Sequence, residues 1–222
     1  NFPLAWLRKA TALSHLKRYE EMLAICERGL EINQDFYFLN CQGLALAGLK
    51  QYDRAIEAYD RAIEVQPEFF EAWNNRGEAY LQTKQLDRAK VNFERAIQLD
   101  KDKSYVSWNN LGKLYLQQRE YQQAIEAYNQ ATQIKEDYLP SLIGLGNAQK
   151  SEKLYDDALE SYDRAIRFNP NSYEAWFGKG LVEESLGQYR EALRSYERAI
   201  SIRPNWDAAI DAFQRIEARL YN

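Results

Sequence analysis

The chain has 222 residues, of which 45% are apolar and 14% aromatic, so it can bury a sizeable core. Its 29 basic and 33 acidic residues are interspersed and give a net charge of −4, without the basic stripe typical of nucleic-acid-binding surfaces. No apolar run reaches the ~20 residues of a membrane-spanning helix and no signal segment opens the chain, so we expect a cytoplasmic protein with no nucleic-acid or membrane partner.

A repeat of 34 or 35 residues runs along the chain. Small residues recur at Gly43, Gly77, Gly112, Gly146 and Gly180, and a second set recurs at Ala55, Ala89, Ala124, Ala158 and Ala192. Four positions before each glycine is a large apolar residue: Leu39, Trp73, Trp108, Leu142 and Trp176. Four positions after each alanine is an aromatic residue: Tyr59, Phe93, Tyr128, Tyr162 and Tyr196.

Each repeat has the apolar period of two helices. Within 105–138, Trp108, Leu111, Gly112 and Tyr115 fall at i, i+3, i+4 and i+7, which places them on one face of a helix. A second stripe with the same period begins at Ala124. Only 5 prolines and 10 glycines interrupt the whole chain, so helix propensity is high throughout. Each repeat is therefore predicted to be a helical hairpin, with the small residues where its two helices approach closely.

The repeats divide the chain into similar segments that we expect to form a single domain over 1–222. Their predicted bounds are about 3–35, 36–69, 70–104, 105–138, 139–172 and 173–206, followed by a capping helix at 207–220. An extra residue in "LDKDKSY" (99–105) predicts one longer turn between repeats. In the capping helix, Ile210 and Phe213 take the apolar positions and Gln214 replaces the glycine, as suits a helix with no partner after it.

These residues carry a resemblance to a known family. Trp108-x2-Leu111-Gly112-x2-Tyr115, then Ala124-x3-Tyr128, then a proline in sister repeats, resembles the tetratricopeptide repeat (TPR). The near-regular repeats are also similar to those of bacterial TPR arrays. The resemblance implies an all-α, right-handed superhelical solenoid of antiparallel helix pairs. It also implies that the first helix of each pair lines a concave groove, which binds a protein or an extended peptide.

Two similar stretches, "AWNNRGEAY" (72–80) and "SWNNLGKLY" (107–115), place asparagine pairs in predicted first helices. By the resemblance they face the groove, where a primary amide can both donate to and accept from a peptide backbone. The candidate groove residues are Asn40, Asn74, Asn75, Glu78, Asn109, Asn110, Lys113 and Asn147. The alternative is that the amides bridge neighbouring helices and serve the scaffold.

A second peptide-binding mode of the family clamps a carboxylate at the end of a peptide, as in chaperone adaptors. The matching groove positions here lack the required succession of lysine, asparagine and arginine. Lys113 and Lys150 are therefore interpreted as solvated charges.

No residue pattern predicts catalysis, a metal site or a cofactor. His15 is expected at a helix end on the surface, and Cys26 and Cys41 are expected to be buried, reduced thiols. The predicted function is a protein- or peptide-binding scaffold that is not an enzyme. The alternative is a regulatory or sensor module of a larger kinase, protease, glycosyltransferase or signalling ATPase, whose catalytic part lies outside this chain. The absence of an initial methionine favours a parent protein of that kind.

Overall fold

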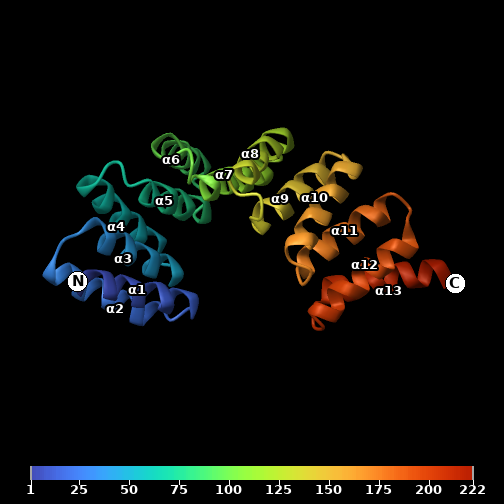
Figure 1. Ribbon diagram of the computed structural model, residues 1–222, viewed down its shortest axis with the longest axis horizontal. Coiled ribbons are helices and arrows are strands. Elements are labelled where there is room, and N and C mark those ends of the chain that lie inside the picture. The colour runs from blue at the N-terminus through green and yellow to red at the C-terminus, as the bar shows by residue number, and fades with distance from the viewer. Residues whose placement is uncertain (1, 222) are drawn as a thin grey trace. The chain divides into compact units, whose positions relative to one another are not determined.

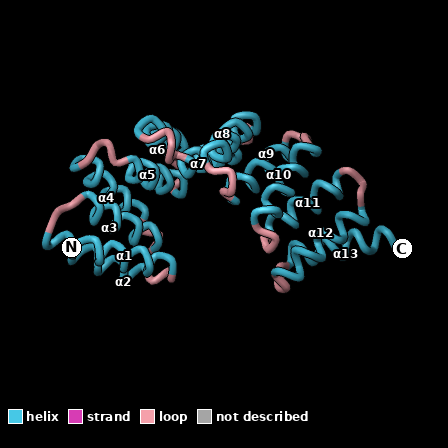
Figure 2. The backbone as a smooth tube through the Cα atoms, viewed as in Figure 1, coloured by secondary structure: helices cyan, strands magenta, loops and turns pink. Residues whose placement is uncertain are grey.

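The computed structural model describes the backbone of residues 2–221 and the side chains of residues 5–220. Within this range every regular element is an α-helix, as Figures 1 and 2 show. The helices are α1 (Phe2–His15), α2 (Tyr19–Ile32), α3 (Phe36–Gly48), α4 (Tyr52–Val65), α5 (Phe70–Gln82), α6 (Leu86–Leu99), α7 (Tyr105–Gln118), α8 (Tyr121–Ile134), α9 (Leu139–Ser151), α10 (Tyr155–Phe168), α11 (Tyr173–Ser185), α12 (Tyr189–Ile202) and α13 (Asp207–Tyr221). The prediction of an all-α repeat fold is confirmed.

The contacts between helices divide the chain into two compact units. Unit 1 is Asn1–Leu114 and unit 2 is Tyr115–Asn222, so the boundary falls within α7. In unit 1, α1 packs on α2, α3 on α4 and α5 on α6; in unit 2, α9 packs on α10 and α11 on α12. Each pair also packs on the next pair in its unit, through α2 with α3, α4 with α5 and α10 with α11. The first helices also contact one another, α3 with α5 and α9 with α11.

The tight turn inside each hairpin uses the left-handed backbone region. After α3, Lys50 has φ 60°, and the Gln51 amide donates back to the Leu46 carbonyl at 2.9 Å, which closes the helix end. The equivalent positions are Lys17, Lys84, Arg119, Lys153 and Gly187. Only the last of these is a glycine, so the other turns accept a basic residue in a backbone conformation that disfavours side chains.

The repeating glycines meet the repeating aromatic rings, as the sequence predicts. A Cβ atom added at Gly43 would lie 2.4 Å from the Tyr59 ring of the same hairpin. The ring of Tyr162 is enclosed from two sides, because added Cβ atoms at Gly146 and at Gly178 of the next repeat would lie 2.8 and 2.4 Å from it. These rings fill the core by lying against bare helix backbone.

In two of the turns between repeats, a tryptophan side chain from the next helix donates a hydrogen bond to the turn. The indole Nε1 of Trp73 donates to the Pro67 carbonyl at 2.9 Å, and Trp176 repeats this with Pro170 at 3.0 Å. The turn at 100–104 is longer than the turn at 66–69, as the extra residue predicts. The prolines therefore do more than end the preceding helix, because their carbonyls hold the start of the next repeat.

The last helix, α13, covers the end of unit 2 with a different face from the one predicted. Ala209, Ala212 and Ile216 are buried, whereas Ile210 and Phe213 are only half-buried. Gln214 is exposed, so the side chain at the glycine position meets no partner helix.

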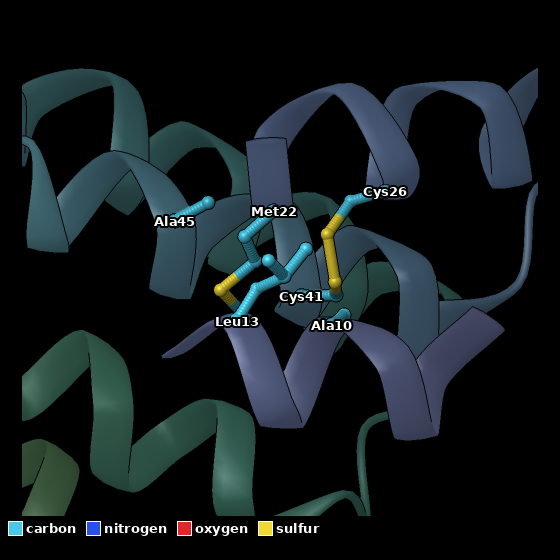
Figure 3. Close-up of a cluster of buried hydrophobic side chains, with 6 residues drawn as sticks. All are labelled: Ala10, Leu13, Met22, Cys26, Cys41 and Ala45. Carbon is cyan, nitrogen blue, oxygen red and sulfur yellow. A yellow bond between two sulfur atoms is a disulfide. The ribbon is translucent and has the colours of Figure 1, made fainter. Parts of the chain in front are cut away.

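Cys26 of α2 and Cys41 of α3 form a disulfide, with their Cα atoms 5.8 Å apart. Figure 3 shows the bond within the buried cluster that includes Leu13 and Met22. The prediction that both cysteines are reduced is therefore wrong in this structure, although their burial is confirmed. Sequence reasoning missed the bond because the two positions become neighbours only when the second helix of one repeat packs on the first helix of the next.

Candidate functional site

The side-chain amides of unit 1 form a chain of hydrogen bonds across three first helices, α3, α5 and α7. Asn75 Nδ2 donates to Asn40 Oδ1 at 2.9 Å, and Asn74 Nδ2 donates to Asn75 Oδ1 at 3.3 Å. Asn110 Nδ2 then donates to Asn74 Oδ1 at 3.2 Å, and Asn109 Nδ2 to Asn110 Oδ1 at 3.4 Å. We call these five residues the amide ladder.

The ladder is buried at its α7 end and partly accessible at its α3 end. Asn109 and Asn110 are 1% and 2% exposed, whereas Asn40 and Asn75 are half-buried. The Ser107 hydroxyl also donates to Asn74 Oδ1, at 3.0 Å. A buried amide with protein partners braces the helices, so Asn109 and Asn110 serve the scaffold here.

Asn75 keeps unused hydrogen-bonding capacity. A primary amide has two N–H donors and two oxygen lone pairs. In Asn75, one donor reaches Asn40 and one lone pair receives the bond from Asn74, so one donor and one lone pair have no partner among the described residues. Asn40 accepts through its oxygen, and neither of its own N–H donors has a partner within the same range. The same side chains can therefore brace the helices and engage a ligand.

Two hollows in unit 1 meet at Asn75 and Leu44. The first hollow has a volume of about 490 Å³, and its lining includes Tyr19, Leu44, Tyr52, Asn75, Glu78 and Gln82. The second hollow, of about 460 Å³, is lined by residues that include Asn40, Leu44, Phe70, Asn74, Asn75 and Tyr105. Because both share Leu44 and Asn75, they form one continuous surface along α3, α5 and the start of α7, which we call the unit 1 groove.

Three charged side chains line the unit 1 groove: Glu78 in the first hollow, and Glu71 and Lys103 in the second. Glu78 is exposed in the first hollow, and burial, together with this carboxylate, raises the pKa of the Tyr59 phenol beneath it. In the second hollow, burial raises the pKa of Glu71 above its ordinary value. Tyr59 therefore stays a neutral hydroxyl at physiological pH, and the groove offers aromatic, amide and carboxylate groups.

Four of the predicted groove residues line neither hollow: the buried Asn109 and Asn110, Lys113 and Asn147. Lys113 is exposed on α7, and its Nζ donates to Asn110 Oδ1 at 3.3 Å. Asn147 belongs to unit 2, where its Oδ1 accepts from the Tyr162 hydroxyl of the same hairpin at 2.8 Å. Asn147 thus holds its own helix pair together.

Sequence reasoning missed the aromatic walls of the groove. Tyr19 and Tyr52 are the first residues of α2 and α4, and Phe70 and Tyr105 are the first residues of α5 and α7. The signal was available, because an aromatic residue begins many of the helices. These positions look like ordinary packing residues until the fold shows that they border a hollow.

The described residues contain no cluster of three or more His, Cys, Asp or Glu side chains arranged to hold a metal ion. His15 is exposed and ends α1, as predicted. None of the helices in the described part of the chain is long and apolar enough to cross a membrane.

The family of the chain follows from sequence comparison. Models described as the tetratricopeptide repeat match residues 4–36, 42–104, 105–138 and 145–220. The chain is a tetratricopeptide repeat protein. The matches cover nearly all of its helix pairs, and they agree with the period of glycine, alanine and aromatic residues. The comparison with curated proteins finds no match.

Solved structures share the TPR fold. A structure described as YrrB, "a TPR protein with an unusual peptide-binding site", has a TM-score of 0.66 at 20% identity, over 85% of this chain and 97% of its own. MamA has a TM-score of 0.65 at 25% identity, over 72% and 93% of the two chains. PilF of Pseudomonas aeruginosa has a TM-score of 0.81 at 15% identity, over 98% and 97%.

Proposed function

We propose that this TPR protein is a scaffold that binds an extended peptide, or an extended segment of a partner protein, in the unit 1 groove. The observation that carries the proposal is the junction of the two hollows at Asn75 and Leu44. There an amide with one donor and one acceptor that no described residue uses lines the same hollows as an exposed leucine. A peptide backbone needs both hydrogen-bonding roles, and its side chains need apolar surface.

Four further observations support this proposal. Leu44 is 38% exposed and lines both hollows, so a ligand in the groove can contact an apolar side chain there. The aromatic walls add rigid contact area at low entropic cost. The amide ladder fixes the side chains of Asn40 and Asn75 before a ligand binds, so binding costs little side-chain entropy at these two residues. YrrB, whose description names a peptide-binding site, has the same fold.

The proposal is tested by selecting peptides from a random twelve-residue display library on the immobilised full chain. The affinity of a selected peptide is then measured by fluorescence anisotropy for the wild type and for Leu44→Gln. We expect the substitution to weaken binding by about tenfold, because a buried leucine contact contributes roughly 1.5–3 kcal/mol. The melting temperature should stay nearly unchanged, since Leu44 is already exposed.

Val91→Gln is the matched control. Val91 is a mid-helix apolar residue on α6, 61% exposed, and it lines neither hollow. Its substitution should leave the affinity within about twofold of the wild type. If both variants bind equally well, or if no peptide is selected at all, the unit 1 groove is not a peptide-binding site.

A further inference from the structure

Unit 2 contains a separate hollow with a basic lining. Its volume is about 430 Å³, and it lies between α9, the start of α10, α11 and α13. Its lining includes Lys150, Tyr155, Leu181, Glu184, Arg215 and Arg219. Three cations thus surround one carboxylate, and we call this surface the basic hollow.

The one carboxylate in the basic hollow is already neutralised. Arg215 Nη2 donates to Glu184 Oε2 at 2.8 Å, and the Tyr196 hydroxyl donates to the same oxygen at 2.7 Å. Burial alone would raise the pKa of Glu184, but the hydrogen bonds from Arg215 and Tyr196 outweigh burial and hold the pKa below its ordinary value. The charges of Glu184 and Arg215 therefore cancel, and the charges of Lys150 and Arg219 are left.

Neither of those two cations forms an ion pair among the described side chains, although the charge of Arg219 helps to lower the pKa of Glu184. Lys150 is half-buried in the last turn of α9, and burial lowers the pKa of its ammonium group. No ion pair in the described part of the chain includes it. The guanidinium of Arg219 lies over the Tyr189 ring, 4.6 Å from its centroid, which holds the side chain beside the hollow. A partly desolvated ammonium without a counter-charge is costly, and an incoming anion relieves that cost.

We propose that the basic hollow binds the carboxylate side chains of an acidic peptide segment. This is a second binding surface, separate from the unit 1 groove, with a defined ligand chemistry. Lys150 and Arg219 come from different helices, α9 and α13, with Glu184 of α11 also lining the hollow. Two cations on separate helices suit two carboxylates along a peptide better than the single carboxylate at a chain end. Leu181 and Tyr155 provide apolar walls for the aliphatic parts of the peptide.

The test uses three labelled twelve-residue peptides and the full chain. The first contains Glu, Ala and Leu and has blocked ends; the second has Gln in place of every Glu; the third is the Gln peptide with a free C-terminal carboxylate. Binding is measured by fluorescence anisotropy at low ionic strength, where charge interactions are least screened. We expect the first peptide to bind at least about tenfold more tightly than the second, as charge-assisted hydrogen bonds allow.

Lys150→Met removes the proposed contact, and Lys153→Met is its matched control. Lys153 is exposed two residues beyond α9 and does not line the hollow, so its loss changes the net charge by the same amount. Lys150→Met should weaken binding of the acidic peptide by about tenfold, whereas Lys153→Met should change it by less than about twofold. The melting temperature of Lys150→Met should be unchanged or higher, because the half-buried ammonium is removed.

Several outcomes would overturn the inference. Equal affinity for the Glu and Gln peptides, or equal effects of the two lysine variants, would exclude carboxylate binding in the basic hollow. Tight binding of only the third peptide would assign the hollow to a chain end and not to acidic side chains. The Leu44→Gln variant separates this inference from the proposed function, because it should lose the library-selected peptide and keep the acidic one. If the wild type binds the library-selected peptide but not the acidic peptide, this inference is refuted and the proposed function is not.

Discussion

Asn75 Nδ2 donates to Asn40 Oδ1 at 2.9 Å, which joins the first helices of two successive repeats. The pairing explains why the asparagines recur at the repeat's period although asparagine is a mediocre helix former. In stacked helices, each step from one repeat to the next adds an amide hydrogen bond that an isolated helix cannot form. The ladder accordingly combines a buried end that braces the scaffold and an accessible end that can contact a ligand.

The two ends of the ladder should respond differently to alanine. Asn110→Ala removes a buried amide that donates to Asn74 and accepts from Asn109, so we expect a loss of about 1–3 kcal/mol in the free energy of unfolding. Asn75→Ala should cost less, about 1 kcal/mol, because Asn40 and Asn74, which lose Asn75 as a partner, both line the second hollow, where water can replace it, and alanine favours the helix. Chemical denaturation of both variants measures the difference.

Affinity should follow the opposite order. Asn75→Ala should weaken binding of a library-selected peptide by about two- to tenfold, at one lost hydrogen bond of roughly 0.5–1.5 kcal/mol. Asn110→Ala should have little direct effect. Asn129→Ala, on α8 outside the ladder, is the control for both measurements. Equal stability of the two ladder variants would show that burial does not distinguish their roles.

Glycines that lie against an aromatic ring should not tolerate a methyl group. In Gly178→Ala the new Cβ would lie 2.4 Å from Tyr162 Cε1, inside a fully buried cluster. Overpacking typically costs about 1–3 kcal/mol, which outweighs the roughly 1 kcal/mol that alanine gains in a helix. We expect lower stability by denaturant titration. A double-mutant cycle with Tyr162→Leu should show strong non-additivity, and simple additivity would mean that the ring is not the obstacle.

Gly187→Ala tests the cost of the left-handed backbone conformation at a position where the added methyl group meets no other atom. Its φ is 75°, and no atom lies within 4 Å of an added Cβ, so only the left-handed conformation opposes the substitution. We expect a loss of about 1 kcal/mol. The reverse substitution Lys84→Gly, at φ 60° in an equivalent turn, should lose no stability or gain a little. If Gly187→Ala is neutral, these turns carry no conformational strain.

The sequence predicts the contacts that recur within every hairpin. It predicts less well the contacts that form only when one hairpin packs on the next. The period of Gly43 and Tyr59 indicates a close contact within one hairpin, and the structure confirms it. The Cys26–Cys41 bond and the pairing of Asn74 with Asn110 join different repeats, so they require the register of one hairpin on the next.

The basic hollow shows the same limit for charges. Lys150 alone resembles a solvated lysine, because its neighbours Arg215 and Arg219 are far along the chain and reach the hollow only once α13 packs at the end of unit 2. Glu184 is equally uninformative in sequence, since its neutralisation by Arg215 links α11 to α13. The ligand contacts of the unit 1 groove stay a prediction, because they depend on the chemistry of the partner as well as on this chain.

Reduction of the disulfide should loosen the first repeats. The bond closes a loop with a sequence separation of 15, for which chain entropy gives about 3 kcal/mol of stabilisation. Adding a reductant should therefore lower the denaturation midpoint and increase amide hydrogen exchange in α1, α2 and α3. A variant with Cys26→Ala and Cys41→Ala should not respond to the reductant. An identical response of wild type and variant would contradict a stabilising bond.

The state of these cysteines in the cell also tests the expected cytoplasmic location. Cytosolic thiols are kept reduced, whereas disulfides persist in oxidising compartments. If the protein is cytoplasmic, rapid alkylation of intact cells should modify both Cys26 and Cys41. Protection of both until a reductant is added would place the protein in an oxidising compartment.

Glu183 should make the free energy of unfolding of unit 2 higher at acid pH than at neutral pH, an effect that exposed glutamates do not produce. The side chain is 5% exposed, and burial raises the pKa of its carboxyl, although the Ser195 hydroxyl donates to it at 2.6 Å. The folded state therefore keeps the proton at a pH where the unfolded chain has lost it. As the pH rises from about 4, the unfolded-state value, through the higher folded-state pKa, the free energy of unfolding falls.

Glu183→Gln should remove this penalty, because the amide is neutral at every pH and its oxygen can still accept from Ser195. We expect the variant to have a higher denaturation midpoint than the wild type at pH 7, with the advantage shrinking toward pH 4. Glu160→Gln, at an exposed position on α10, should show neither effect. A lower midpoint for Glu183→Gln at pH 7 would mean that the ionised carboxylate is stabilising, through the nearby Lys179, and that burial is the smaller of the two influences.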